Sequence, residues 1–265
     1  MAENTEIVEQ KQTFSMALTE RLDGVADALP KDFNKARFVQ NAVALLNGND
    51  TLIDYRNEYG DKGARQILAG LVKGAFLNLD FLSNEAYLVP YKSKLQFMPS
   101  YRGCVKLAQK YSIRPIKDIY AKVVRKGDEF QEKIVNGQPT IDFAPLPFND
   151  GEIVGAFAVC QFADGGMQYD VMSLKELEHT RKASRMKSGV VWEQYTSEMY
   201  RKTVIRRLTK HIQLDFDNPE QYEYFNEGDQ IELNDRKPKG ASLNNILVED
   251  NIVDVDAEQK GEEDV

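Results

Sequence analysis

Residues 153–176 read IVGAFAVCQFADGGMQYDVMSLKE, and this stretch predicts two strands, a turn and the start of a helix in direct succession. Ile153–Phe162 and Met167–Met172 are apolar runs of strand length. The segment Asp164-Gly165-Gly166 between them is a strong turn signal, which joins the two runs as an antiparallel hairpin. Ser173-Leu174-Lys175-Glu176 then matches the capping box, in which the Ser and Glu side chains satisfy two backbone donors at a helix start.

Strand signals continue upstream of this stretch, and helical periodicity lies on both sides of them. The other predicted strands are Ala86–Pro90 and Lys94–Met98, paired as a short hairpin, then Ile116–Val124 and Ile141–Phe143, with Asn136-Gly137 as a further turn signal. The predicted helices run from Phe14 to Pro30, over Phe38–Leu46, Ala64–Leu79, Ser100–Tyr111 and Trp192–Ile212. Helices first, hairpins in the middle and helices after them predict an α+β fold: a small antiparallel β-sheet with hairpins packed against helices, and a helical N-terminal region.

The composition limits the class of protein. The 265 residues suffice for one large domain with tails or for two small domains, and 42% hydrophobic residues can build a real core. No run of eighteen apolar residues occurs, so we expect no contact with a membrane. Because the start of the chain also lacks the pattern of a secretory signal, we expect a cytoplasmic protein. Cys104 and Cys160 stand in apolar surroundings, and we expect them to be reduced and buried.

Charge is unevenly distributed along the chain, whose net charge is −8. From Asp215 onward the sequence has sixteen acidic and four basic residues, a net charge of −12. Residues 1–214 therefore carry a net charge of +4. We therefore predict an N-terminal arm or helix over 1–30 as a candidate subunit contact, a DNA-binding core over 31–215, and a disordered acidic tail over 216–265. The tail's apolar residues form either a poorly ordered patch or a short docking segment for a partner protein; they are Ile246, Leu247, Val248, Ile252, Val253 and Val255.

The window Arg181–Lys210 carries nine Lys or Arg and two acids, which indicates a polyanionic ligand. On one helix, Lys202, Arg206 and Lys210 share a face and repel one another by about a few tenths of a kcal/mol per pair, which bound phosphates would relieve. Trp192 falls on the same face, together with Tyr195 and Met199, whereas Val204, Ile205, Leu208 and Ile212 lie opposite and should face the core. Cations combined with aromatic rings suit single-stranded nucleic acid, whose bases stack on the rings.

Three neighbouring features extend this hypothesis, and a solvated charged helix face is its plain alternative. Lys182, Arg185 and Lys187 lie in a connection that contains Ser and Gly, where cations could close over a strand. Tyr101-Arg102 opens a helix beside free backbone amides that favour an anion. Arg125-Lys126 ends a strand, where a turn would expose both cations.

Enzyme motifs are absent from the sequence. It contains no P-loop, no nucleophile elbow and no dinucleotide fingerprint. His179 and His211 have no second ligand nearby, so we expect no metal site. Asp128-Glu129 could serve a metal-dependent nuclease, but a Glu-x-Lys triplet on the following strand is not convincingly present. We therefore expect a protein without catalytic residues.

Three segments, in order, resemble the RecT family of phage single-strand annealing recombinases. The first is Asn84–Tyr91 with Phe97–Gly103, the second is Val123–Phe130, and the third is Trp192–Lys210, above all Met199–Leu208. The likeness covers about residues 30–215. Tyr200 departs from it, because a small residue is more usual at that position.

The resemblance implies a DNA-binding protein that anneals complementary single strands without ATP during homologous recombination. It implies self-assembly into a ring or helical filament, a partner exonuclease and a host single-strand-binding protein as partners, and contact with the annealed duplex. No cofactor would be required, with Mg²⁺ only a modulator of DNA binding. By motif position, Tyr101, Arg102, Arg125 and Lys126 would lie near the DNA groove, and Lys202, Arg206, Arg207 and Lys210 would line it. A single-stranded DNA- or RNA-binding protein that does not anneal, and a metal-dependent nuclease, remain the alternatives.

Overall fold

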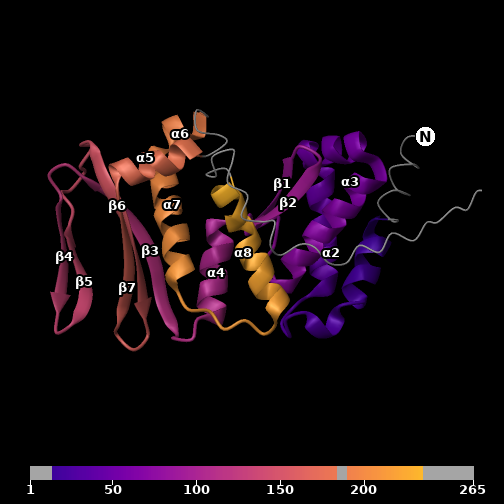
Figure 1. The fold of residues 1–265 in the computed structure, drawn as a ribbon, viewed down its shortest axis with the longest axis horizontal. Helices are drawn as coiled ribbons and strands as arrows, with labels where there is room; N and C mark the ends of the chain where they lie inside the picture. Colours follow the sequence, from indigo (N-terminus) through magenta and orange to yellow (C-terminus); the bar gives the residue numbers. More distant parts are fainter. Residues whose placement is uncertain (1–13, 184–189, 235–265) are drawn as a thin grey trace, which may run out of the picture.

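The computed structural model describes residues 14–183 and 190–234. Its helical elements are residues 14–23, η1 (Ala26–Ala28), α2 (Lys35–Asn47), α3 (Asp50–Phe76), α4 (Tyr101–Tyr111), α5 (Leu174–Ala183), α6 (Val190–Gln194), α7 (Thr196–His211) and α8 (Pro219–Asn234). The strands are β1 (Ala86–Tyr91), β2 (Lys94–Pro99), β3 (Ile116–Arg125), β4 (Glu129–Val135), β5 (Gln138–Ala144), β6 (Ile153–Phe162) and β7 (Met167–Ser173). Figure 1 shows an elongated molecule with a sheet at one end and a helical region at the other. The predicted α+β class is confirmed.

The central sheet has the strand order β3-β6-β7 and is antiparallel throughout. Alternate residues of β6 point to opposite faces, and both faces are covered. Ala156, Ala158 and Cys160 face the cluster formed with α5 and α7, whereas Phe157 and Val159 face the β4–β5 hairpin. Burial on both sides explains why this strand is apolar almost without interruption.

The β4–β5 hairpin covers the outer face of the sheet. Its turn is Asn136-Gly137, where both residues have positive φ (51° and 75°), as a two-residue hairpin turn of type I′ requires. Phe130 and Phe143 pack against Phe157 at centroid distances of 5.2 and 5.0 Å. The sequence predicts this turn but not β4, because the residues of β4 are mostly polar and exposed.

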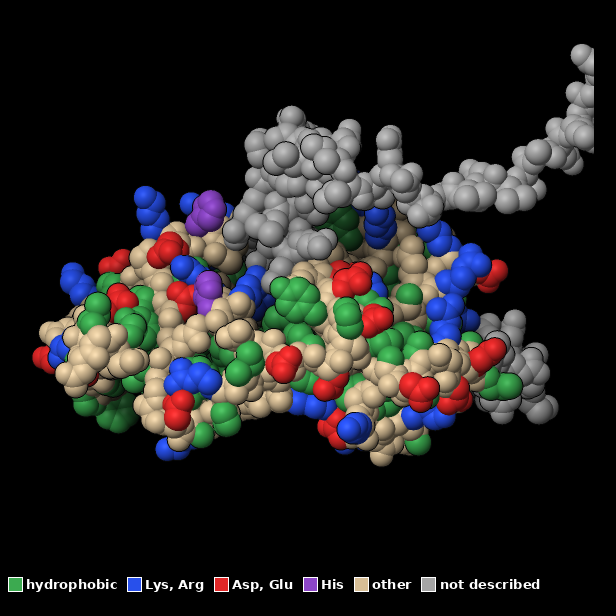
Figure 2. Space-filling view, turned by 60° about the horizontal axis from the view of Figure 1, so that its bottom comes forward, with side chains coloured by type: hydrophobic (Ala, Val, Ile, Leu, Met, Phe, Trp, Pro, Cys, Tyr) green, Lys and Arg blue, Asp and Glu red, His purple; other side chains and the backbone are tan. Residues whose placement is uncertain are grey.

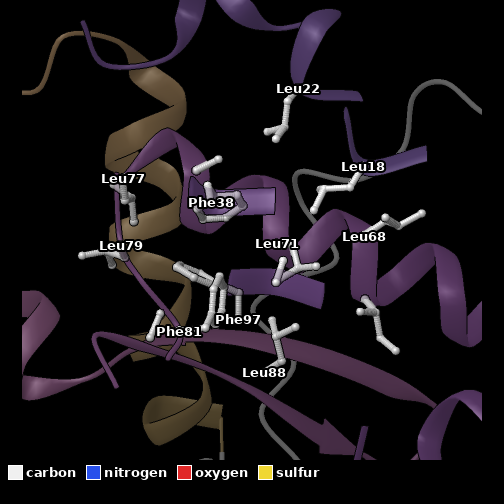
Figure 3. Close-up of a cluster of buried hydrophobic side chains, with 14 of the residues drawn as sticks. Leu18, Leu22, Phe38, Leu68, Leu71, Leu77, Leu79, Phe81, Leu88 and Phe97 are labelled. Carbon is white, nitrogen blue, oxygen red and sulfur yellow. The ribbon is translucent and has the colours of Figure 1, made fainter. Parts of the chain in front are cut away.

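The helical region encloses the larger core, in which side chains from α2, α3 and the β1–β2 hairpin converge (Figure 3). Phe38, Leu71 and Phe97 are buried at its centre. The predicted helix over Ala64–Leu79 begins earlier, at Asp50, and bends at Gly60, whose φ of 50° is accessible to glycine at little cost. The predicted β1–β2 hairpin and the helix after it are confirmed.

The capping box at the start of α5 is also confirmed. The backbone N–H of Ser173 donates to Glu176 Oε2 (2.9 Å), and the backbone N–H of Glu176 donates to Ser173 Oγ (3.3 Å). The hydrogen bond from the Ser173 backbone lowers the pKa of the Glu176 carboxyl, as does Arg207. The hairpin β6–β7 therefore passes directly into a helix, as residues 153–176 predict.

The structure corrects the start of the acidic tail. Residues beyond 216 were expected to be disordered, but α8 packs against the helical core. Gln221 is 0% exposed and donates through Nε2 to the carbonyl of Phe76 (2.8 Å) and to Tyr111 Oη (3.2 Å). Lys73 pairs with Glu227 at 2.5 Å. The apolar residues of α8 follow the helical period only weakly, and the helix is held in place by contacts with residues distant in sequence. Residues 235–265, with the apolar patch of the tail, lie outside the described residues.

Both cysteines are buried and free, as expected. Burial raises the pKa of the Cys160 thiol to about 11, so the thiolate is disfavoured. Within the described chain, none of the helices combines the length and the apolar character that crossing a bilayer demands.

Candidate nucleic-acid interface

Helix α7 lies between the central sheet and α4 (Figure 1). Val204, Leu208 and Ile212 are buried against the sheet, which confirms the predicted apolar side of this helix. Ile205 is only half-buried, at the edge of the same cluster. The cations of the helix are left to its other faces.

Trp192 does not lie on the cationic face, which corrects a prediction. The predicted single helix breaks at Tyr195 (φ −122°, ψ 37°), so α6 and α7 have different directions. The break turns Trp192 inward, where it is 5% exposed and packs 6.2 Å from the Tyr200 ring. The Arg181 guanidinium covers the indole at 5.7 Å. In this conformation bases cannot stack on Trp192, whereas Tyr195 is 57% exposed.

Two segments a hundred residues apart meet at the start of α4. Lys202 Nζ lies 5.6 Å from the centroid of the Tyr101 ring, and the Arg102 guanidinium lies 5.9 Å from it. Arg102 Nε also donates to Tyr101 Oη at 3.2 Å, and this hydrogen bond raises the pKa of the guanidinium. An aromatic ring flanked by two cations can stack a base while the cations hold phosphates. We call Tyr101, Arg102 and Lys202 the cationic aromatic cluster.

The backbone amides at this helix start are not free, in contrast to the prediction. Ser100 Oγ accepts from the backbone N–H groups of Arg102 (3.1 Å) and Gly103 (3.2 Å). A serine N-cap satisfies the donors that an anion would otherwise bind. Gly103 is required here, because a Cβ at this position would lie 2.1 Å from the carbonyl oxygen of Glu85.

Arg125 fixes the end of β3 to the start of α7. Its guanidinium donates to the carbonyl of Gly151 (2.6 Å) and to Ser197 Oγ (3.1 Å). The neighbouring Lys126 side chain is exposed. Arg125 therefore orients the two elements, while Lys126 is the cation at this end that solvent, or a ligand, can reach.

The Arg207 side chain points toward acidic residues of β7 and of the first turn of α5. Its Nε lies 3.0 Å from Asp170 Oδ2, and its Nη1 lies 3.2 Å from Glu176 Oε1. Burial raises the pKa of Asp170, although Arg207 and His211 oppose the rise. The charge of Arg207 thus compensates a carboxylate whose side chain is only 11% exposed. The resemblance placed Arg207 in the DNA groove, but the structure shows that its guanidinium is engaged in ion pairs.

The remaining predicted residues are spread along the helices. Lys182 is exposed at the end of α5, Lys210 is exposed in the last turn of α7, and Arg206, one turn earlier in α7, is half-buried. Arg185 and Lys187 lie outside the described residues. On the face displayed in Figure 2, cations and acids are interspersed, without a stripe of one sign.

Two residues near the site were not singled out in the sequence. Ser197 holds Arg125, and Tyr87 is exposed on β1, where its phenol acts electrostatically on Arg102. Tyr87 lies within Asn84–Tyr91, in the first of the three segments that resemble the RecT family, and this resemblance could have identified it as a candidate site residue. Nothing in the local sequence of Ser197 indicates its partner, because the contact joins residues 72 positions apart.

Of the two carboxylates considered for a nuclease, Asp128 has a structural use. Asp128 Oδ2 accepts from the Arg125 backbone N–H (2.8 Å), and Asp128 Oδ1 accepts from Asn149 Nδ2 (2.7 Å) and the Leu146 backbone N–H (3.0 Å). Burial alone would raise the pKa of Asp128, but these hydrogen bonds outweigh it and lower the pKa. Within residues 14–183 and 190–234, His, Cys, Asp and Glu side chains do not gather in threes as a metal site needs.

The fold and the site together define an α+β protein in which a basic helix brings cations and an aromatic ring together beside an antiparallel sheet. Residues 36–238 match the model of the RecT family. The chain is 29% identical to Protein RecT of Escherichia coli (strain K12) over 198 residues. The matched region covers 71% of this chain and 70% of that protein. The chain belongs to the RecT family. Membership supports a general function in DNA recombination by single-strand annealing.

Proposed function

We propose that this protein anneals complementary DNA strands without ATP, by holding single strands along α4 and α7. The observation that carries the proposal is the cationic aromatic cluster, in a chain of the RecT family. Tyr101 offers a ring on which any base can stack, and Arg102 and Lys202 offer contacts to phosphates. Neither kind of contact depends on base identity, as an annealing protein requires.

Annealing needs no chemical step from the protein, because base pairing supplies the driving force. The protein has to bind two strands and screen the repulsion between their phosphates. Exposed cations such as Lys126, Lys182 and Lys210 provide this screening where the bound strand extends beyond the cationic aromatic cluster. No cofactor takes part in this scheme, and Mg²⁺ acts only by modulating DNA binding.

The proposal includes assembly and partners. Copies of the chain form a ring or helical filament that presents one strand with its bases exposed. A partner exonuclease supplies the 3′ single strand, a host single-strand-binding protein is displaced or contacted, and the complex acts in the bacterial cytoplasm. Membership in the RecT family is the support for these partners.

An annealing assay tests the proposal directly. Two complementary oligonucleotides, one labelled with a fluorophore and the other with its quencher, are mixed without ATP, with and without the protein. We expect faster duplex formation that is abolished by prior addition of excess unlabelled noncomplementary strand. Binding without acceleration would identify a protein that only protects single-stranded DNA or RNA. Incubation with Mg²⁺ or Mn²⁺ should leave the strands uncut, and their cleavage would identify a nuclease.

A further inference from the structure

The β1–β2 hairpin has one buried face and one outward face. Leu88 from β1 and Phe97 from β2 point into the helical core (Figure 3). Because side chains alternate along a strand, Tyr87 points to the opposite side, where it is 42% exposed. The hairpin therefore packs on the core through one face and presents an aromatic ring to solvent on the other.

The outward face of the hairpin adjoins the cationic aromatic cluster. The backbone N–H of Ser100 donates to the carbonyl of Glu85 (2.9 Å), which fixes the start of α4 against the start of β1. Arg102, in the first turn of α4, interacts with the phenols of Tyr101 and Tyr87. Both interactions raise the pKa of its guanidinium, and that with Tyr101 contributes more. The cluster thus has a second aromatic ring beside it.

The charge of this segment is opposite to that of the whole chain. Residues 86–103 contain three cations and no acid, in a chain whose net charge is −8. Lys94, one of the three, is exposed and lies directly opposite Tyr91 in the hairpin. Opposite residues share a face of the hairpin, and Tyr91 follows Tyr87 by four positions, so Lys94 and Tyr87 both lie on the outward face. Four residues of a strand span about 13 Å.

Two acids beside the hairpin are paired within the chain. Glu85, directly before β1, pairs with Lys106 at 2.6 Å. Glu227 belongs to α8, which packs against β2, and it pairs with Lys73 at 2.5 Å. Because these carboxylates are compensated, the cations of the outward face can attract a polyanion. A cationic face with an aromatic ring fits a nucleic acid strand better than an acidic or apolar protein partner.

We propose that the single strand continues from the cationic aromatic cluster onto the outward face of the β1–β2 hairpin, where Tyr87 stacks one base and Lys94 contacts a phosphate. The inference rests on the proposed function, and it extends the binding surface to an element outside α4 and α7. A base stacks through its face, so its pairing edge stays free for the complementary strand. Neither contact depends on base identity.

Fluorescence anisotropy of a labelled single-stranded oligonucleotide tests Tyr87. We expect Y87A to lower the affinity about fivefold or more, as the loss of one stacked base does. The salt dependence should not change, because the substitution removes no charge. Y87F keeps the ring and should bind as the unchanged chain does. So should the matched control Y222A, since Tyr222 is 62% exposed but lies on α8. Unchanged affinity of Y87A, or an equal loss in Y87A and Y222A, would overturn the inference.

An abasic oligonucleotide shows whether the ring of Tyr87 touches bases. Such a strand has the same number of phosphates as the intact one but lacks the surfaces that stack. The unchanged chain should bind the abasic strand more weakly than the intact strand. In Y87A the ratio of these two affinities should be smaller by about fivefold or more. An equal ratio in both chains would mean that Tyr87 contacts no base, and it would reject the inference even if Y87A weakened binding.

The salt dependence of binding tests Lys94. Removal of one phosphate contact in K94Q should lower the slope of log K against log[salt] by about 0.7. K31Q is the matched control: Lys31 is exposed, and its neighbour Asp32 pairs with Lys110 in the last turn of α4, at the opposite end of that helix from Tyr101. Its slope should equal that of the unchanged chain. No change in K94Q, or the same change in both variants, would refute the path along the hairpin.

Failure of this inference and failure of the proposed function give different results. If the unchanged chain anneals DNA and Y87A and K94Q bind as it does, only the path along the hairpin is rejected. If the unchanged chain binds single strands without accelerating their annealing, the proposed function is rejected, while weaker binding by Y87A would still support the path. An unchanged chain that binds no single-stranded DNA would reject both.

Discussion

Replacing Arg102 and Lys202 together by Gln should flatten the salt dependence of single-stranded DNA binding. Arg102 is exposed, and Lys202 Nζ and the Arg102 guanidinium lie 5.6 and 5.9 Å from the centroid of the Tyr101 ring, so both cations can face phosphates of one strand. Gln keeps much of the length of both side chains and removes only the charge. The fold should persist, because neither side chain belongs to the buried core.

The magnitude follows from counterion release. Each phosphate contact on a single strand contributes about 0.7 to the slope of log K against log[salt], so the loss of two contacts lowers the slope by about 1.4. A rise from about 50 to about 200 mM salt changes log[salt] by about 0.6. The affinity ratio between the unchanged chain and the variant should therefore shrink about sevenfold over this range.

Fluorescence anisotropy of a labelled oligonucleotide measures these affinities at four or five salt concentrations. Arg207→Gln is the matched control, because Arg207 carries the same charge on the same helix as Lys202 but pairs with Asp170 and Glu176. Its binding slope should equal that of the unchanged chain. A slope that falls equally in the control and in the double variant would refute the assignment of the cationic aromatic cluster.

Arg207→Gln should instead lower the free energy of unfolding by about 1 kcal/mol, a value that allows for the partial exposure of the ion pair between Arg207 and Asp170. The pKa of Asp170 is already raised by burial and should rise further without the guanidinium. A carboxyl with a raised pKa in the folded state stabilises the fold below the ordinary Asp pKa, and that contribution is lost as pH rises through the raised pKa. Thermal unfolding should therefore show a smaller penalty near pH 4, where Asp170 is largely protonated and the ion pair with Glu176 remains, than at neutral pH. A penalty independent of pH would contradict this account.

Three further predictions concern the fold. A chain that ends at residue 234 should unfold at the temperature of the whole chain, whereas one that ends at residue 215 should unfold several degrees lower by circular dichroism, because the polar contacts of Gln221 and the cover over Phe76 are lost. Gly103→Ala should lower the free energy of unfolding by about 3 kcal/mol or more in urea titrations, since its Cβ meets backbone at 2.1 Å, and a neutral result would mean that α4 can move away from Glu85. Cys160 should resist a thiol reagent at pH 8 until denaturant is added, because burial raises its pKa to about 11, and rapid labelling of the native chain would contradict that burial.

The local parts of this protein follow from its sequence. The hairpin β6–β7, the capping box at Ser173 and the turn at Asn136-Gly137 are predicted correctly, because each depends on hydrogen bonds and dihedral preferences among a few adjacent residues. The apolar side of α7 is equally readable, since it needs only the helical period. The ordered motifs of the RecT family were also available in the sequence, and with them the class of function.

Only the tertiary structure decides which of the predicted site residues are available to a ligand. Trp192 has the right residue type and spacing for a stacking platform, but a break at Tyr195 buries it. Arg207 has the right charge, but its acids come from β7 and the start of α5. Helix α8 has little apolar period, and it is held by contacts to Phe76 and Tyr111. For Arg207 and α8 the deciding partners are distant in sequence, and a pattern of neighbouring residues contains no information about them.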